Sequence, residues 1–243
     1  MSLVYLVLTY LVAAIPFGLV ITTLYGGDVD LRVAGSGNIG ATNVARLFGW
    51  RLAVPVLVLD ISKGFVPVAL APLVWPEGGV VWGGVVGLVA FLGHCYPAYL
   101  EFRGGKGVAT GGGAMLALAP IPSLAAVGVW VGLLVVTGRS SVAALGATLG
   151  VVVLAGLLQP QVVWVAALLA LGVAIRHVAN IRRLMAGEER ELIHPVRWGR
   201  RREAQPSPEE LLLQAPSGTE ATVPLWREEV VDPLEATDPG TGE

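Results

Sequence analysis

Charged residues are scarce in this chain of 243 residues: they make up 14% of it, against about 25% in an ordinary soluble domain. Hydrophobic residues make up 54%, and this balance excludes a soluble enzyme and a coiled coil. The one cysteine, Cys95, has no partner for an internal disulfide, which excludes a disulfide-stabilised scaffold. The composition therefore predicts an all-α polytopic membrane protein.

The few charges are unevenly spread along the chain. Residues 1–202 hold 15 basic and 8 acidic side chains, whereas residues 203–243 hold one basic and ten acidic ones. The C-terminal part is rich in Pro, Glu and Thr and lacks hydrophobic periodicity, a pattern typical of disorder. We therefore expect an integral membrane domain over 1–200 and a disordered cytoplasmic tail over 201–243.

Apolar stretches of membrane-spanning length follow one another through the body. A crossing helix needs about 20 mostly apolar residues, and the longest stretch, 107–137, is long enough for one helix or two. Pro120 and Pro122 lie in its middle and interrupt helical hydrogen bonding. Splitting it gives seven transmembrane or part-membrane helices, over 2–25, 52–75, 80–99, 107–119, 121–137, 141–157 and 161–176; leaving it whole gives six.

The distribution of Lys and Arg favours the seven-helix arrangement. In it, the connections 26–51, 100–106, 138–140 and 177–202 share one face of the membrane. Together with Arg176, which ends the segment 161–176 at this face, they hold every basic residue of the body except Lys63. The opposite connections hold none. By the positive-inside rule this face is cytoplasmic, which puts the N-terminus outside and the C-terminus in the cytoplasm.

Four polar constellations interrupt the apolar sequence, and the first is the segment 35–46. Its glycines free the backbone to present N–H groups to an anion, and uncharged donors and an arginine stand among them. The candidate residues are Ser36, Gly37, Asn38, Thr42, Asn43 and Arg46. A G-x-G-x-x-G match is present, but no strand precedes it, so a dinucleotide fold is excluded. The alternative is a capped helix start beside a routine cytoplasmic arginine.

The second constellation is Asp60 and Lys63, which lie on one face of an otherwise apolar helix. Charges inside a membrane segment are costly, so they indicate a functional site by default. Lysine is rare here, with only Lys63 and Lys106 against 14 arginines, and this favours a need for a compact ammonium at these two places. The alternative is an internal ion pair that only orients helices.

The third constellation is the run Gly104, Gly105, Lys106 and Gly107 at the start of a predicted helix. Bare N–H groups, the positive end of the helix dipole and an ammonium together predict phosphate binding. The spacing does not fit a Walker A loop. Upstream, Cys95 reads as inert packing, and the adjacent His94 as either a polar anchor or a site residue.

The fourth constellation follows the last membrane helix. His177 and Asn180 lie on one helical face at its cytoplasmic end, and Arg182 and Arg183 suit a membrane surface. The alternative for His177 and Asn180 is a hydrogen-bonded pair at a helix end. Ser141, in the preceding cytoplasmic turn, is a weaker candidate.

Together these constellations resemble, in order and spacing, the motifs of the bacterial acyl-phosphate-dependent glycerol-3-phosphate acyltransferase family, over roughly residues 1–190. The resemblance implies transfer of a fatty acyl group from acyl phosphate to the 1-hydroxyl of sn-glycerol 3-phosphate, giving lysophosphatidic acid and phosphate. It implies catalytic roles for His177, Asn180, Ser36 and Arg46. It implies phosphate binding by Gly37, Asn38, Thr42, Asn43, Lys63, Gly104, Gly105, Lys106, Gly107 and Ser141.

The same resemblance implies a multi-pass protein of the bacterial inner membrane with its active site on the cytoplasmic face. No cofactor, metal or nucleic acid is expected, and the partners are the two substrates, membrane lipid and, transiently, the soluble enzyme that forms acyl phosphate. The acidic tail inherits no function, and Ala144 stands where a second serine is common in the family. Two questions stay open: whether His177 or a substrate phosphate is the general base, and whether the chain is instead an anion transporter or channel.

Overall fold

The computed structural model describes residues 2–25 and 29–193, and this part of the chain contains helices and turns and no strand. The longer elements are α1 (Ser2–Ala13), α2 (Phe17–Leu24), α3 (Ala41–Phe48), α4 (Trp50–Leu70), α5 (Gly79–Cys95), α6 (Val108–Leu118), α7 (Pro120–Thr137), α8 (Ser140–Leu158), α9 (Val163–Arg176) and α10 (Val178–Met185). Short 3₁₀ turns follow α4, α5 and α8, at Ala71–Leu73, Ala98–Leu100 and Pro160–Val162. The predicted tail, 201–243, lies outside the described residues.

The helices account for the seven predicted segments. α4, α5, α7 and α8, with their adjoining turns, are each long and apolar enough to cross a membrane. Two bent pairs pass the same test together: α1 with α2, at an angle of 44°, and α9 with α10, at 60°. The chain does split at Ala119, as the two prolines predict, because α6 ends at Leu118 and α7 begins at Pro120. At 11 residues, α6 is too short to cross a bilayer on its own.

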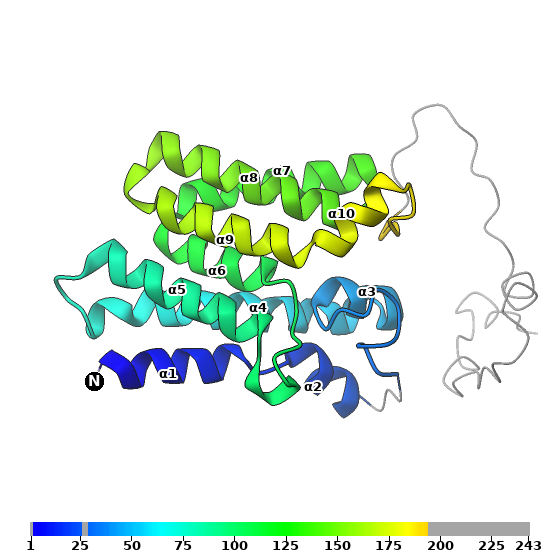
Figure 1. Cartoon of the computed structure of the whole chain (residues 1–243), viewed down its shortest axis with the longest axis horizontal. Helices are drawn as coiled ribbons and strands as arrows, with labels where there is room; N and C mark the ends of the chain where they lie inside the picture. Colours follow the sequence, from blue (N-terminus) through cyan, green and yellow to red (C-terminus); the bar gives the residue numbers. More distant parts are fainter. Residues whose placement is uncertain (1, 26–28, 194–243) are drawn as a thin grey trace, which may run out of the picture. The chain divides into compact units, whose positions relative to one another are not determined.

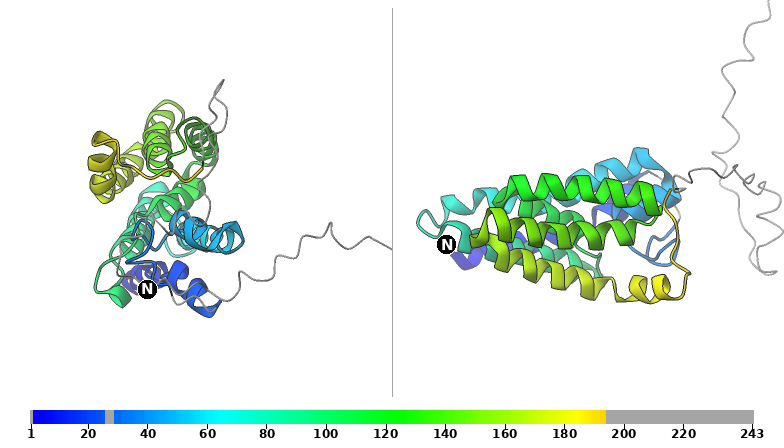
Figure 2. Two further views of the ribbon diagram at one scale, coloured as in Figure 1. Left: turned by 90° about the vertical axis from the view of Figure 1, so that its right-hand side faces the viewer. Right: turned by 90° about the horizontal axis from the view of Figure 1, so that it is seen from above.

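The helices form a layered bundle, which Figure 1 shows from the side. α1 packs on α4 and α5, α6 packs on α4 and α5, and α7, α8 and α9 cover the far side. Figures 1 and 2 show α3 and α10 at the same end of the bundle, away from the N-terminus and from the turn between α4 and α5. The segments that carry the first and fourth constellations are therefore gathered at one end, whereas Asp60 and Lys63 lie midway along α4.

Glycines set the close approach of α4 to α6. A Cβ atom at Gly64 would overlap the carbonyl oxygen of Thr110, and one at Gly113 would overlap that of Ile61. Small residues allow backbones to approach in this way in membrane bundles, where the hydrophobic effect adds little. The contact fixes α4 and α6 relative to each other, and these helices form two walls of the cavity described next.

Candidate active site

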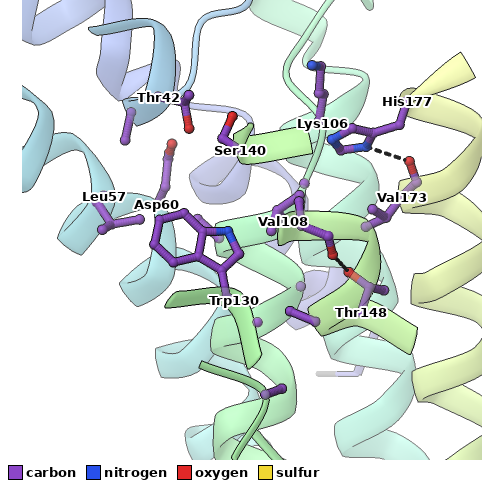
Figure 3. Close-up of a pocket in the computed structure, with 18 of the residues that line it drawn as sticks. Thr42, Leu57, Asp60, Lys106, Val108, Trp130, Ser140, Thr148, Val173 and His177 are labelled. Carbon is purple, nitrogen blue, oxygen red and sulfur yellow. Dashed lines mark hydrogen bonds between the residues drawn. The ribbon is translucent and has the colours of Figure 1, made fainter. Parts of the chain in front are cut away.

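A cavity of about 470 Å³ lies between α3, α4 and the helices from α6 to α10. One end is polar and is lined from four segments that are far apart in the sequence, and the other end is apolar. Figure 3 shows Thr42, Lys106 and His177 along the polar end, with Trp130 of α7 below them. The volume is that of an ordinary ligand pocket, about 300–1,000 Å³.

Asn43 shapes the loop before α3. Its side chain is fully buried; its Oδ1 accepts the N–H of Ser36 at 2.8 Å, and its Nδ2 donates to the carbonyls of Leu31 and Ala34 at 3.2 and 3.1 Å. A Cβ atom at Gly35, where φ is +60°, would overlap the Asn43 oxygen, so this turn requires glycine. The loop held in this way contributes Ser36 and Asn38 to the lining of the cavity, and α3 contributes Thr42 and Arg46.

The glycine loop before α6 is bonded on both sides. The N–H groups of Gly104 and Gly105 donate to the carbonyls of Cys95 and His94, each at 3.1 Å. The guanidinium of Arg176 donates to the Gly104 carbonyl at 2.7 Å and to the Gly105 carbonyl at 2.9 Å. These two N–H groups are therefore occupied by backbone carbonyls, and the two glycines give the loop its shape.

Lys106 starts a hydrogen-bonded chain across the polar end. Its Nζ donates to Oδ1 of Asn180 at 2.6 Å, and Nδ2 of Asn180 donates to Oε1 of Glu189 at 2.5 Å. The second Glu189 oxygen accepts from Nε of Arg183 at 2.8 Å. Arg190 donates to the carbonyl of Gly35 and so ties the end of this chain to the loop before α3. All six of these residues line the cavity.

Burial decides the charge state of this network. It lowers the pKa of Lys106 to about 8, against the attraction of the Glu189 carboxylate. Burial alone would raise the pKa of Glu189, but its hydrogen bonds, including those from Asn180 and Arg183, outweigh burial and hold that pKa below its ordinary value. At neutral pH the site therefore holds an ammonium that is close to titration beside a firmly ionised carboxylate.

His177 lies at the break between α9 and α10, with a side chain that is 2% exposed. Its Nδ1 is 2.8 Å from the carbonyl oxygen of Val173, the contact drawn in Figure 3. A carbonyl accepts hydrogen bonds only, so this contact assigns the proton to Nδ1 and leaves a lone pair on Nε2. The side chain lines the cavity, and in this tautomer it can accept a proton there.

The apolar end of the cavity has a closed side and an open side. On the closed side the lining is buried and comes from α6, α8 and α9, with Met115, Ala147 and Leu169 as examples. On the open side the lining comes from α4 and α7 and is exposed, at Leu57, Leu124, Val127 and Val131. In a bilayer these exposed side chains face lipid, so the apolar end opens laterally toward the hydrocarbon core.

Asp60 and Lys63 form a buried ion pair, with Lys63 Nζ 2.8 Å from Asp60 Oδ1 and relative exposures of 4% and 2%. Lys63 Nζ also donates to the carbonyl oxygen of Ile15 at 3.0 Å, in the break between α1 and α2. Nδ1 of His94 is 3.7 Å from Asp60 Oδ1. Asp60 and His94 line the cavity. Lys63 is held on the far side of Asp60, where it stabilises the bend of the first segment.

The predicted site residues divide into two groups. The cavity is lined by Ser36, Asn38, Thr42, Arg46, Lys106, Gly107, His177 and Asn180. Six others are not part of the lining: Gly37, Asn43, Lys63, Gly104, Gly105 and Ser141. Contact of these six with a phosphate stays a prediction.

Sequence reasoning missed three charged residues of the lining, Arg183, Glu189 and Arg190, as well as the loop-holding role of Arg176. The only available signal was their position directly after the fourth constellation. Arginines after the last membrane helix are typical of any cytoplasmic membrane surface. The spacing of these arginines in the sequence does not show which of them faces the cavity.

The fold and the cavity together define an integral membrane protein whose site combines a polar end rich in cationic side chains with an apolar end open to lipid. The sequence profile of the family described as "Glycerol-3-phosphate acyltransferase" matches residues 3–187. The chain is 43% identical over 192 residues to the glycerol-3-phosphate acyltransferase of Anaeromyxobacter dehalogenans (strain 2CP-C), covering 75% of this chain and 93% of the relative. It is 47% identical over 194 residues to that of Methylorubrum populi, covering 76% and 89%. The chain belongs to the glycerol-3-phosphate acyltransferase family.

Solved structures lead to the same assignment. The crystal structure of PlsY (YgiH), an integral membrane glycerol 3-phosphate acyltransferase, in its glycerol 3-phosphate form, matches with a TM-score of 0.73 and 37% identity over 78% of this chain and 94% of that one. The lysophosphatidic acid form of PlsY matches with a TM-score of 0.72 and 35% identity over the same shares. The chain is therefore an acyltransferase, which rules out the alternative of an anion transporter or channel.

Proposed function

We propose that this protein transfers a fatty acyl group from acyl phosphate to the 1-hydroxyl of sn-glycerol 3-phosphate, giving lysophosphatidic acid and phosphate. The observation that carries the proposal is the continuity of one cavity from a cationic end to an apolar end that opens to lipid. A site of this form suits a pair of substrates that are both phosphorylated when one of them also carries a long chain. The family assignment supports the same acceptor.

The charges of the lining suit two phosphates. Four cations face the cavity, against two carboxylates; the cations are Arg46, Lys106, Arg183 and Arg190, and the carboxylates are Asp60 and Glu189. Arginine offers a planar fork for phosphate oxygens, whereas lysine acts as a point charge. We assign Lys106 and Asn180 to the phosphate of glycerol 3-phosphate, and Arg46, with Ser36 and Thr42, to that of acyl phosphate.

The reaction needs little beyond positioning and proton transfer, because acyl phosphate is an activated mixed anhydride. The hydroxyl oxygen of glycerol 3-phosphate forms a bond to the acyl carbon, the bond from that carbon to the phosphate oxygen breaks, and phosphate leaves. The cationic lining stabilises the charge on the leaving phosphate, and fixed geometry removes the entropic cost of bringing the reactants together.

His177 is the best placed proton acceptor. With Nδ1–H donated to the Val173 carbonyl, Nε2 is free to take the hydroxyl proton and pass it to the leaving phosphate. A phosphate oxygen of the substrate is the competing base, and kinetics of His177 variants separate the two. Asn180 is hydrogen-bonded to both Lys106 and Glu189 and so fixes the positions of these two side chains.

The proposal places the cavity on the cytoplasmic face of the bacterial inner membrane, since the connections that line its polar end carry the body's arginines. Glycerol 3-phosphate then enters from the cytoplasm, and the acyl chain from the bilayer or from a transiently bound soluble enzyme that forms acyl phosphate.

Purified full-length protein in lipid nanodiscs, supplied with acyl phosphate and labelled glycerol 3-phosphate, tests the proposal. We expect lysophosphatidic acid and phosphate in equal amounts, and no product when acyl-CoA replaces acyl phosphate. The control is the His177→Ala variant in identical nanodiscs. Product formation from acyl-CoA alone, or none from acyl phosphate in well-folded protein, overturns the proposal.

A further inference from the structure

The helix that carries His177 also carries a stripe of cavity-lining residues below it. Val173, Leu169 and Ala166 precede His177 by four, eight and eleven positions, and all three are buried and line the cavity. These spacings keep the side chains on one face of α9. The stripe leads from the reacting end of the cavity into the bundle for about 16 Å, at 1.5 Å per residue.

α8 carries a second stripe of the same depth. Ala144, Ala147, Thr148 and Val151 follow Ser140 on one face and line the cavity. Val151 is eleven positions from Ser140, again about 16 Å at 1.5 Å per residue. α8 and α9 pack against each other, and Val151 packs against the buried cluster that contains Ala166, so these two residues lie at the inner ends of the two stripes.

Packed core closes the cavity beyond this level. Ala155, one helical turn further along α8, and Ala119 and Val162 are completely buried, belong to the same hydrophobic cluster as Ala166 and do not line the cavity. The inner side of the cavity therefore ends blindly near Val151 and Ala166, in contrast to its open side between α4 and α7.

We propose that Val151 and Ala166 set the acyl-chain length that the enzyme prefers, by forming the floor of the chamber that receives the end of the chain. The inference rests on the proposed function, since it needs a bound acyl chain. An extended chain advances by about 1.25 Å per carbon–carbon bond of 1.5 Å. A depth of about 16 Å, eleven helical residues, then holds about thirteen bonds. Chains that fit bury every methylene, and longer chains must bend or push toward the opening.

Val151 is the better site for a test because its side chain is only half-buried and faces the cavity, so a larger residue has room to point inward. Val151→Phe should make the chamber shallower, and Val151→Ala should make it deeper. The control is Val153→Phe: Val153 is on the same helix, is 53% exposed and does not line the cavity.

The measurement is kcat/KM for dodecanoyl phosphate and for hexadecanoyl phosphate in the same nanodiscs, with glycerol 3-phosphate saturating. One methylene in a closed apolar pocket is worth about tenfold or more in discrimination. We therefore expect Val151→Phe to lower the hexadecanoyl-to-dodecanoyl ratio at least tenfold, Val151→Ala to raise it, and Val153→Phe to leave it unchanged. The KM for glycerol 3-phosphate should stay the same in all three.

The outcomes show whether the end of the acyl chain lies at the floor of the chamber or at the opening between α4 and α7. If both Val151 variants are folded and active with an unchanged ratio, while Val127→Phe at the opening changes it, the chain end lies between α4 and α7 and the inference is overturned. A wild-type protein inactive with both donors instead overturns the proposed function. Thermal unfolding of each variant shows that the comparison is made on folded protein.

Discussion

Lys106 and Asn180, which are 74 positions apart in the sequence, are joined by a hydrogen bond of 2.6 Å between Nζ and Oδ1. The bond connects the glycine loop before α6 to the helix after His177, and so joins the third and fourth sequence constellations into one site. It also occupies an ammonium that the sequence alone would leave free. A phosphate that binds Lys106 must share it with the Asn180 amide.

The pKa of Lys106, about 8, predicts a pH dependence of substrate binding. The ammonium is charged below that pH and is lost above it, while a phosphate monoester, with its second pKa of about 6, stays a dianion throughout. The KM for glycerol 3-phosphate should therefore rise roughly tenfold between pH 7 and pH 9.5, the worth of one charge-assisted hydrogen bond of about 1.5 kcal/mol. Lys106→Arg should remove the rise, because arginine stays charged; a parallel rise in that variant contradicts the assignment.

Replacing His177 separates proton transfer from helix-end structure. Asparagine can keep a side-chain N–H near the Val173 carbonyl but has no basic nitrogen. If Nε2 is the general base, His177→Asn should lower kcat by about 10²–10⁴-fold, as general acid–base assistance requires, with a smaller effect on KM and no loss of thermal stability. A decrease of only about threefold would assign the proton to a substrate phosphate.

Gly105→Ala should act through the loop. The added Cβ would overlap the ring of His94, so the loop that precedes Lys106 must shift. Since Lys106 binds ground state and transition state alike, the expected result is a higher KM for glycerol 3-phosphate with a smaller change in kcat. The control is Gly132→Ala, where a Cβ would meet nothing within 4 Å. If the change raises only the KM for acyl phosphate, the two phosphate sites are assigned the wrong way round.

The Asp60–Lys63 pair should matter for stability. Asp60→Asn leaves a buried ammonium without its countercharge, which costs about 3–5 kcal/mol, and should lower the thermal unfolding temperature markedly. The double change Asp60→Asn with Lys63→Met should recover much of the loss. The control is the exposed pair Asp30 and Arg32, also at 2.8 Å, whose neutralisation should leave the unfolding temperature nearly unchanged. Equal losses at the two pairs would show that Lys63 and Asp60 are not desolvated in the membrane.

The orientation of the chain is tested by single cysteines at Glu77 and Arg139, which lie at opposite ends of the bundle by the predicted topology. Cys95 is fully buried and should not react. An impermeant reagent added to intact cells should label position 77 only. Labelling of position 139 from outside would reverse the orientation and place the polar end of the cavity away from the cytoplasm.

The sequence was sufficient for the segments and for eight of the residues that line the cavity. Periodicity, the paired prolines and the placement of arginines predict the seven segments because each is a local property. The bend at Ala14–Pro16 was missed, because an apolar stretch reads the same whether straight or broken. The hydrogen bond from Lys63 to the Ile15 carbonyl depends on that bend, so it could not be predicted from the sequence either.

The occupied N–H groups of Gly104 and Gly105 show a second limit. A glycine-rich run at a helix start predicts free donors, but the structure uses both of them to hold the loop against the end of α5. Which donors a fold uses for itself depends on how the chain packs, here on the carbonyls of His94 and Cys95 at the end of α5. Phosphate recognition therefore falls more to side chains than the pattern alone suggests.

The shortness of α6 has a consequence for the energetics of using a lipid as a reactant. Its 11 residues extend about 16 Å, roughly half of a hydrocarbon core of about 30 Å. Lys106 and Gly107, which precede it, are thus carried below the level of the neighbouring helix ends, and the polar end of the cavity follows them. Raising a chain out of the bilayer would cost about 0.8 kcal/mol per methylene exposed. With the polar end brought down to the hydrocarbon, the proposed reaction can join the acyl carbon to the acceptor hydroxyl while the chain stays among apolar neighbours.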